Sequence, residues 1–400
     1  MVKGKTPRVQ WGRLFLDWRI LEGAIIYVKT FGYKNLTVVN KWFISSIQSF
    51  NNVAFIALMK FTSYAETLGL STLLYLTRSF AWSDPRDHLI SLFGLARDID
   101  QDGLLFQADY KVPFVELFKH FVIWDIFEKR SLECFSSGCD QQVTSPSWVP
   151  DFTSWNEHPA KPRDQIDFKA TRDSELCATL SEDGMILSLV GKLLDEVTVL
   201  GPMYPITPFE EPDYKLDTTQ GTVESLQSLY ELRYRQETIW SRECKALALK
   251  GSDSLSFQRL DGFCRSMLWD TYIQGYEIGS TALLTQFETL IDCLATPLDE
   301  RDLDWFSRFD GIVPKVVTDL PTFSNGRHLS ETQNGRLGSM PKGTKVGDKI
   351  CILYGGNLPY VIRPCGEGKY TLVGDCYVNG LMYGEAMDMD EIKTETIHLI

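Results

Sequence analysis

The last quarter of the chain constrains the fold most, because short apolar runs rich in β-forming residues alternate there with glycine turns. The triplets Gly355-Gly356-Asn357 and Gly366-Glu367-Gly368 are typical of turns that connect neighbouring antiparallel strands. The runs around these turns are predicted strands, at residues 350–354, 359–363 and 370–378. Strands this short and this close together predict an antiparallel β module, either a small twisted sheet or a partly closed barrel.

The rest of the sequence indicates helices, so the expected fold class is α+β, with a mainly helical body and the C-terminal antiparallel module. Apolar residues recur at spacings of three and four, the helical period, in residues 10–28, 51–80, 113–128 and 223–309. Residues 184–200 have the pattern of strands. Four regions are expected: helical residues 1–155, a short β segment at 156–205, a second helical region at 206–310 and a β-rich module at 311–400.

Composition and charge exclude several classes of protein. Hydrophobic residues make up 44% of the chain, enough to form sizeable cores, so a wholly disordered chain is excluded. The net charge of −13 argues against a general nucleic-acid binder, because the chain would repel phosphate backbones. Residues 1–50 carry a net charge of +6. This basic segment is interpreted as a solvated face, with contact to an acidic partner or a lipid surface as the alternative.

Targeting and redox signals predict a cytoplasmic protein without a membrane span. The apolar stretch Val53–Met59 is stopped by Lys60, far short of the 18 or more residues that a span requires. Acidic and basic residues interrupt the basic N-terminus, which excludes a signal-peptide core. The nine cysteines are scattered and odd in number, as expected for reduced cytosolic thiols.

Residues 98–109 resemble a calcium-binding loop. The carboxylates of Asp98, Asp100, Asp102 and Asp109 fall at alternating positions and at position 12, with Gly103 at the turn. Two features oppose calcium binding: Asp109 is shorter than the glutamate that usually chelates at position 12, and Pro113 prevents the exit helix from starting at the usual place. An acidic interhelical loop is the favoured interpretation, and no metal or other cofactor is expected.

No sequence motif identifies an enzyme. Residues 338–345 lack the lysine directly after the second glycine that a phosphate-binding loop needs, and the five histidines are isolated. There is no G-x-S-x-G elbow and no H-E-x-x-H motif. A hydrolase that assembles a Cys/His or carboxylate pair in space stays open as the alternative function.

The clearest single element is predicted over residues 83–96. Asp84 is placed to cap a helix, Pro85 to occupy its first position and Asp87 to lie near the positive end of the helix dipole. Arg86 carries five donors in a rigid fork and is predicted to anchor a carboxylate or carbonyls of another element. Farther along, residues 146–155 hold two prolines and two tryptophans, which predicts an extended segment with Trp148 buried.

Three blocks together resemble one family, the fungal heterokaryon-incompatibility (HET-domain) proteins. The blocks are SDPRDHLISLFGLA with FQADYKVPFVELF (83–118), PSWVPDFTSW (146–155) and the run from residue 334 to 386. The resemblance implies structural roles for the residues that match the family's motifs: Asp84, Pro85, Arg86, Asp87, Asp109, Tyr110, Trp148, Pro150, Asp151, Gly355, Gly356, Arg363, Gly384 and Glu385. Asp109 then corresponds to the family's P-D-Y aspartate, at a helix entrance.

The motifs of the family's N-terminal HET domain are absent from this sequence. The chain therefore resembles the region C-terminal to that domain, with residues 10–24 similar to the helix that follows it, and a truncated member is one expectation. No residue here inherits the NAD-cleaving chemistry suggested for the HET domain. The resemblance implies a non-catalytic recognition or regulatory region of a non-self-recognition protein, acting through a protein partner.

Overall fold

The computed structural model describes the backbone of residues 8–11 and 14–17, and residues 68–77, 80, 82–99, 109–137, 146–150, 152, 168–204, 223–252, 254–270, 277 and 279–400. The chain divides into two compact units, Met1–Leu117 and Phe118–Ile400. Each unit is described by itself.

The first unit contains a hairpin and short helices. Strands β1 (Arg8–Trp11) and β2 (Leu14–Asp17) pair antiparallel, with Trp11 opposite Leu14. The helix expected over residues 10–28 is therefore wrong at its start. Helix α3 (Leu70–Leu76) buries Leu70, Leu73 and Leu74, and α4 (Asp87–Ile90) buries Leu89 and Ile90.

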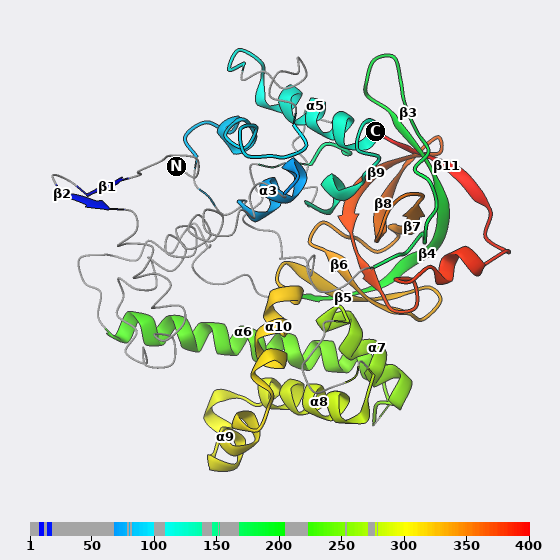
Figure 1. Cartoon of the computed structure of the whole chain (residues 1–400). Helices are drawn as coiled ribbons and strands as arrows, with labels where there is room; N and C mark the ends of the chain where they lie inside the picture. The colour runs from blue at the N-terminus through cyan, green and yellow to red at the C-terminus, as the bar shows by residue number, and fades with distance from the viewer. Residues whose placement is uncertain are drawn as a thin grey trace. The chain divides into compact units, whose positions relative to one another are not determined.

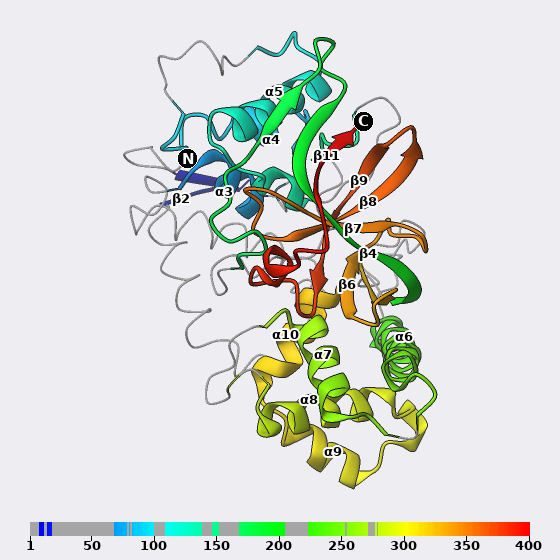
Figure 2. The ribbon, with the colours of Figure 1, turned by 90° about the vertical axis from the view of Figure 1, so that its right-hand side faces the viewer.

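The second unit is built around a closed barrel of five strands (Figures 1 and 2). The strands are β4 (Leu187–Met203), β7 (Lys349–Leu353), β8 (Pro359–Gly366), β9 (Lys369–Asp375) and β11 (Thr394–Leu399). The ring runs β4–β7–β8–β9–β11 and closes because β11 also pairs with β4. All of these pairs are antiparallel except β9–β11, which is parallel.

Strand β4 continues beyond the barrel into a smaller sheet. Its second half pairs with β5 (Arg327–Thr332), which pairs in turn with β6 (Leu337–Pro341) and then β10 (Tyr377–Val378). Strand β3 (Ala178–Leu180) pairs with the first residues of β4. The interior of this β unit is filled by aliphatic side chains, among them Leu194, Ile350, Ile352, Val361 and Val373.

A helical layer packs against this smaller sheet. It consists of α6 (Val223–Leu249), α7 (Phe257–Leu268), α8 (Thr281–Ala295), α9 (Leu303–Asp310) and α10 (Pro314–Ser324), with the short turn η7 (Leu298–Glu300) before α9. Ser256, Ser280 and Asp302 cap α7, α8 and α9 by accepting backbone N–H bonds from the first turn. Their shared core includes Phe263, Met267 and Phe287 together with Leu329 of β5 and Leu337 of β6, so helices and sheet form one hydrophobic interior.

Three further helical segments are a helix and two short turns. Helix α5 (Phe114–Phe127) agrees closely with the prediction over residues 113–128, and its Phe118 and Phe121 contact Phe152. The turn η4 (Glu133–Ser137) contributes Phe135, which contacts Tyr360 of β8 edge to face. The turn η8 (Glu385–Asp388) precedes β11. Within the described part of the chain, no helix combines the length and apolar character needed to cross a bilayer.

The predicted α+β class is confirmed, but two details of the prediction are wrong. The sheet is mixed and not antiparallel, because the chain passes from β10 through η8 and enters β11 in the same direction as β9. The body is also not mainly helical, because β3 and β4 of the predicted 156–205 segment join the C-terminal strands in one nine-stranded sheet. The four predicted domain limits themselves stay a prediction.

The segment around Trp148 is fastened to the barrel. Ser147 donates its backbone N–H to the carbonyl of Ile400 at 2.8 Å, and its hydroxyl accepts the N–H of Leu372 at 2.9 Å. Trp148 has no exposed surface, and its indole N–H donates to the carbonyl of Met185 at 3.2 Å. Pro150 is buried as well, while Asp151 lies outside the described residues. Trp148 is therefore a buried side chain whose segment is bound to β9, to the last residue of the chain and to the residue two positions before β4.

Replacing Trp148 by alanine removes this filling and leaves a cavity. We expect Trp148→Ala to lower the free energy of unfolding by about 3–5 kcal/mol, measured by denaturant titration. The matched control is Val346→Ala, because Val346 is 62% exposed and its truncation is expected to change stability by less than about 0.5 kcal/mol. If Trp148→Ala were as stable as the wild type, the Trp148 side chain would not be packed in the interior.

Candidate functional site

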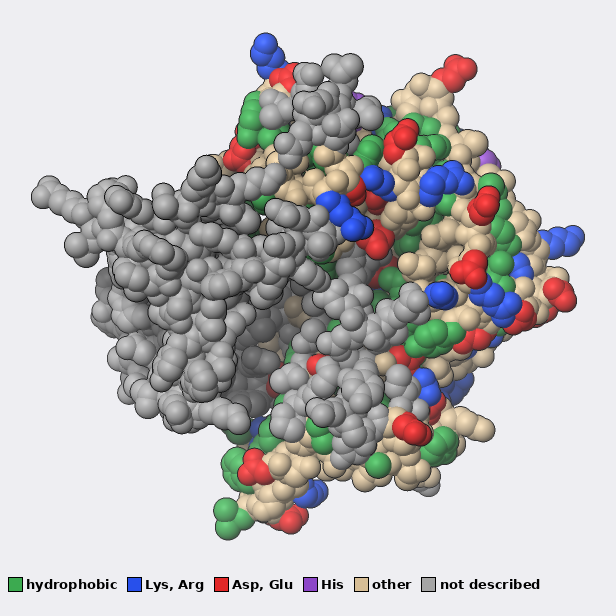
Figure 3. Space-filling model, in the orientation of Figure 1, with side chains coloured by type: hydrophobic (Ala, Val, Ile, Leu, Met, Phe, Trp, Pro, Cys, Tyr) green, Lys and Arg blue, Asp and Glu red, His purple; other side chains and the backbone are tan. Residues whose placement is uncertain are grey.

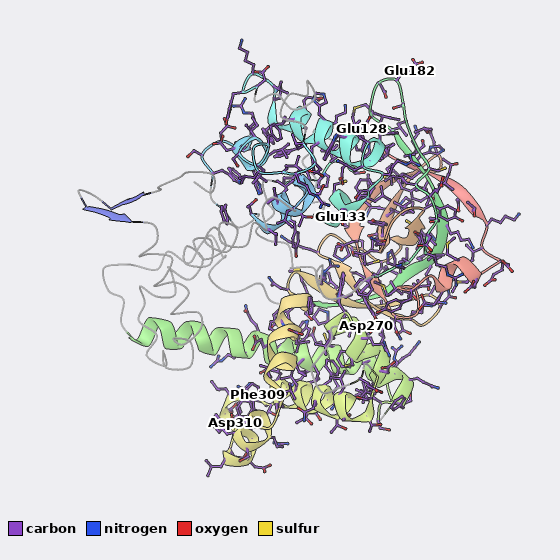
Figure 4. The ribbon with its side chains drawn as sticks, viewed as in Figure 1. Glu128, Glu133, Glu182, Asp270, Phe309 and Asp310 are labelled. Carbon is purple, nitrogen blue, oxygen red and sulfur yellow. The ribbon has the colours of Figure 1, made fainter. Side chains whose placement is uncertain are left out.

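A group of buried polar side chains lies where the helical layer meets the sheet, around Asp270 (labelled in Figure 4). Helix α7 ends at Leu268, and Trp269 and Asp270 follow with φ angles of 51° and 53°. Two consecutive residues other than glycine in the left-handed region are uncommon. This turn directs the Asp270 carboxylate toward β10 and the segment after it.

Asp270 is held by three side-chain donors. Its Oδ1 accepts from Nη1 of Arg265 at 2.8 Å, and its Oδ2 accepts from the hydroxyls of Tyr377 at 2.9 Å and Tyr383 at 3.1 Å. Arg265 also donates from Nε to Asp261, one helical turn before it. One carboxylate thus joins α7 to β10 and to the loop before η8.

Burial dominates the electrostatics of this group. Only 3% of Asp270 is exposed, and this burial raises the pKa of its carboxyl, against the opposing effects of Arg265 and the two hydroxyls. Burial also raises the pKa of Tyr377 and of Tyr383, with the nearby Asp270 charge as the second cause. Both phenols therefore stay protonated at neutral pH and serve as donors.

A second buried ion pair lies beside the first. Arg327 of β5 donates from Nη2 to Oδ1 of Asp375 at 2.9 Å and from Nη1 to the Asp375 carbonyl at 3.0 Å. Its guanidinium carbon lies 4.4 Å from the centre of the Trp269 ring. Arg327 and Asp375 are 5% and 2% exposed, so the pair links β5 to the end of β9 within the interior.

Glu331 of β5 provides a third link to the helices. Its carboxylate accepts from Nη2 of Arg259 at 3.1 Å and from Nζ of Lys250 at 2.6 Å. Arg259 also donates to the carbonyls of Ala248 and Gly335. We name these three groups, centred on Asp270, Asp375 and Glu331, the junction network. Its carboxylates are engaged by arginine, lysine and tyrosine donors, an arrangement that holds elements together.

In the first unit, the predicted Asp84–Arg86 motif forms a network of its own. Asp84 accepts from the backbone N–H and the Nε of Arg86 at 2.9 and 2.8 Å, and its other oxygen accepts from Nη2 at 2.6 Å. Arg86 also donates to the carbonyls of Tyr110 and Val112, and the Tyr110 hydroxyl donates to Asp87 at 2.5 Å. Hydrogen bonding to Arg86 lowers the pKa of Asp84 to about 2. The predicted anchoring of carbonyls by Arg86 is present.

The predicted helix around this motif is shorter than expected. Helix α4 covers only Asp87–Ile90, with Arg86 at its N-cap position. Asp84 caps the preceding turn through the Arg86 N–H, and Pro85 lies within that turn. Both carboxylate oxygens of Asp84 accept hydrogen bonds from Arg86, which explains why Asp84 does not cap the helix itself.

The structure gives other partners to the described residues of the calcium-like loop. Asp98 accepts the backbone N–H of Leu70 at 2.9 Å, at the start of α3, and Asp109 accepts that of Lys111 at 2.8 Å. Asp100 and Asp102 lie outside the described residues. Among the described residues, no group of three His, Cys, Asp or Glu side chains is placed to hold a metal ion.

The motif residues of the C-terminal module have structural contacts. Gly355 has a φ of 82°, and a Cβ there would lie 2.6 Å from the Cβ of Leu176, so the turn needs glycine. The neighbouring Gly356 accepts the Thr171 hydroxyl at its carbonyl. Arg363 of β8 donates from Nε and Nη2 to the two oxygens of Asp348 at 2.9 and 2.8 Å, a bidentate pair.

Gly384 and Glu385 shape the approach to β11. Gly384 has a φ of 90°, and a Cβ there would lie 2.4 Å from the Arg172 side chain. Arg172 pairs with Asp388. Glu385 accepts the backbone N–H of Tyr383 at 2.7 Å, which helps to place that tyrosine beside Asp270. The structural roles expected of the motif residues stay a prediction.

Four of the cysteines considered for nucleophilic chemistry are buried. Burial raises the pKa of the thiols of Cys244, Cys264, Cys351 and Cys376, which lowers their thiolate content. The hydroxyl of Ser188 lies 2.7 Å from Nδ1 of His398, and the two residues are cross-strand neighbours of β4 and β11.

Sequence reasoning missed the junction network. The only hint of this network in the sequence is a single acidic residue within or beside an apolar run, as for Asp375 in LVGDCYV and Asp270 in SMLWD. A charged residue in such a place is rarely buried without a partner. Arg327, Tyr377 and Tyr383 are distant in sequence from the carboxylates that they bind, and they carry no motif.

A closed mixed barrel, extended by a sheet that carries helices, defines a β-barrel domain. A family profile described as the Het-6 beta-barrel domain matches residues 186–399, from the residue before β4 to the last residue of β11. The chain belongs to this family. It is also similar to "Heterokaryon incompatibility protein 6, OR allele" of Neurospora crassa, with 23% identity over 364 residues, which covers 77% of this chain and 50% of that protein.

The chain thus spans about half the length of the curated relative that it matches. No solved structure matches it. The family profile and the relative confirm the resemblance to fungal heterokaryon-incompatibility proteins that the sequence motifs indicated.

The two tyrosines beside Asp270 allow a test of the junction network. Tyr377→Phe leaves a buried carboxylate without one donor, and we expect it to lower the free energy of unfolding by about 1.5–3 kcal/mol in denaturant titrations. Tyr383→Phe is the matched control, because Tyr383 is 45% exposed and water can replace its hydroxyl. A Tyr377→Phe variant as stable as the control would contradict the account.

The Asp84–Arg86 network predicts a change in an acid pKa. In Arg86→Ala, the pKa of Asp84 should rise from about 2 toward its ordinary value of 3.8, because its hydrogen-bond donor is lost. NMR titration of the carboxyl measures this shift. We also expect the melting temperature to fall by several degrees, since the Tyr110 and Val112 carbonyls lose their donor. An unchanged Asp84 pKa would contradict the network.

Proposed function

We propose that this chain is a recognition and regulatory region of a fungal non-self-recognition protein, and that it acts through protein contacts and not by catalysis. The observation that carries the proposal is membership of the Het-6 β-barrel domain family, together with similarity to a protein named for heterokaryon incompatibility. A cytoplasmic location belongs to the same proposal and fits the free thiols among the described cysteines.

The contacts of the junction network support a scaffold role. Asp270, Asp375 and Glu331 each join elements that are distant in the sequence, and each is at most 5% exposed. Breaking such a buried pair is strongly destabilising, so these groups favour one arrangement of the helices on the sheet. A recognition protein needs this property, because loops and helix ends that bind a partner must be held by a rigid framework.

The family assignment leads to an allele test. If the chain determines recognition, replacing its gene in one strain by the allele of an incompatible strain should make the fusion of those two strains compatible. The readout is survival of the fused cells, with reintroduction of the original allele as the control. A fusion outcome that does not change with the allele would contradict the recognition role.

The non-catalytic part of the proposal has a separate biochemical test. The purified chain should leave NAD intact during prolonged incubation, since no residue of this sequence matches a catalytic motif. Chromatography of the nucleotide measures this, with a known NAD-cleaving enzyme as the positive control. NAD loss that follows the purified wild-type protein, and persists through further purification, would contradict it.

A further inference from the structure

Helix α9 exposes large apolar side chains on its outer face. Leu303 is 86% exposed and Phe306 is 54% exposed, and Leu303 is the most exposed large hydrophobic residue of the described part of the chain. Residues three apart on a helix lie on the same face. Leu298, in the turn η7 just before the helix, is 42% exposed. We name Leu298, Leu303 and Phe306 the α9 face.

The opposite side of α9 fixes this helix in the fold. Trp305 is 5% exposed and belongs to the core of the helical layer, where its indole N–H donates to the carbonyl of Cys293 at 2.8 Å. Phe309 stacks on Trp305 with ring centres 5.0 Å apart, and Asp302 caps the helix through the Trp305 N–H at 2.8 Å. The Phe306 ring touches Trp305 edge to face, with ring centres 4.9 Å apart, and leaves 54% of its surface exposed beside Leu303. The exposed apolar surface is therefore held by a well-anchored helix.

Acidic residues surround the α9 face. Residues 298–311 contain five acids and two arginines. Arg308 pairs with Asp304 at 3.4 Å, and Arg301 lies over the Trp305 ring at 4.3 Å. Three acids remain beside the apolar residues: Asp299 and Glu300, which follow Leu298, and Asp310, which lies one helical turn after Phe306 (Asp310 is labelled in Figure 4). Figure 3 shows hydrophobic, acidic and basic side chains close together at the lower end of the helical layer.

We propose that the α9 face binds an amphipathic helical segment of a partner protein, one with an apolar stripe flanked by lysine or arginine. This proposal rests on the recognition function proposed above. Apolar residues spaced by three or four positions are the contacts by which one helix binds another. The acidic surroundings match a basic partner, and such complementarity speeds association and fixes orientation.

The proposal can be tested with a defined probe and the full chain. The probe is a fluorescein-labelled 18-residue peptide of leucine and lysine in an amphipathic helical pattern, and the same pattern with glutamate in place of lysine is the peptide control. Fluorescence anisotropy should show binding of the lysine peptide that weakens as the salt concentration rises. The glutamate peptide should not bind.

Variants assign the binding to the α9 face. Leu303→Ser with Phe306→Ser should weaken binding of the lysine peptide at least tenfold. Because Phe306 also contacts Trp305, circular dichroism and a thermal melt verify that the double variant is folded at the assay temperature, and Leu303→Ser alone, at the 86% exposed position, should weaken binding in the same direction with an unchanged melting temperature. Asp299→Asn, Glu300→Gln and Asp310→Asn together should weaken binding and reduce its salt dependence. Phe257→Ser with Val346→Ser, at exposed positions elsewhere, should bind like the wild type.

Three results would overturn the proposal: equal binding by the Leu303/Phe306 double variant, equal binding of the glutamate peptide, or self-association of the chain that the double variant abolishes. The last result would assign the face to a second copy of the chain. The allele replacement test separates this proposal from the function on which it rests. If that test succeeds and the double variant still supports the incompatible reaction, the recognition function stands and the α9 face is excluded.

Discussion

Hydrogen bonding along strand β4 supports most of the Phe118–Ile400 unit. From Leu187 to Glu196 the strand pairs with β11 on one side and with β3 and β7 on the other, which closes the barrel. From Val197 to Met203 it pairs with β5, the first strand of the sheet that carries the helices. Strand β4 therefore belongs both to the barrel and to the smaller sheet that carries the helices. Register shifts within its pairings with β7 and β5 mark where the strand bends from one to the other.

The side chains of the junction network also connect the helical layer to the sheet. Asp270 joins α7 to β10, Glu331 joins the helices α6 and α7 to β5, and Arg327 joins β5 to Asp375 of β9. Buried pairs of this kind add little net stability compared with apolar residues, because desolvation opposes the attraction between the charges. Their effect here is to favour one docking of the helices. A surface at the far end of the helical layer, such as the α9 face, then keeps a defined position on the barrel.

The sequence predicted local structure better than it predicted pairing. Helix α5 and the strands β7, β8 and β9 could be located because each has its own periodicity or glycine turns. Strand β6 was missed because LGSMP combines glycine, serine and proline, which are poor strand formers, and is buried by its neighbours. The parallel pairing of β11 with β9 follows from a long connection, for which no local pattern exists. The motif residues were proposed as structural from the family resemblance, and that role stays a prediction. Asp270 carries no motif, and its contacts with Tyr377 and Tyr383 join segments that are distant in the sequence.

The central claim is that β4 and the junction network make the barrel and the helical layer one cooperative unit. Native-state hydrogen exchange tests this claim directly by comparing amides of α8 in the helical layer with amides of β7 in the barrel. In one cooperative unit, the slowest amides of both elements open with the same free energy, equal to that of global unfolding, and this is the result that we expect. If the α8 amides instead opened with a free energy lower by about 2 kcal/mol or more while β7 stayed protected, the helices would unfold alone and the account would be wrong.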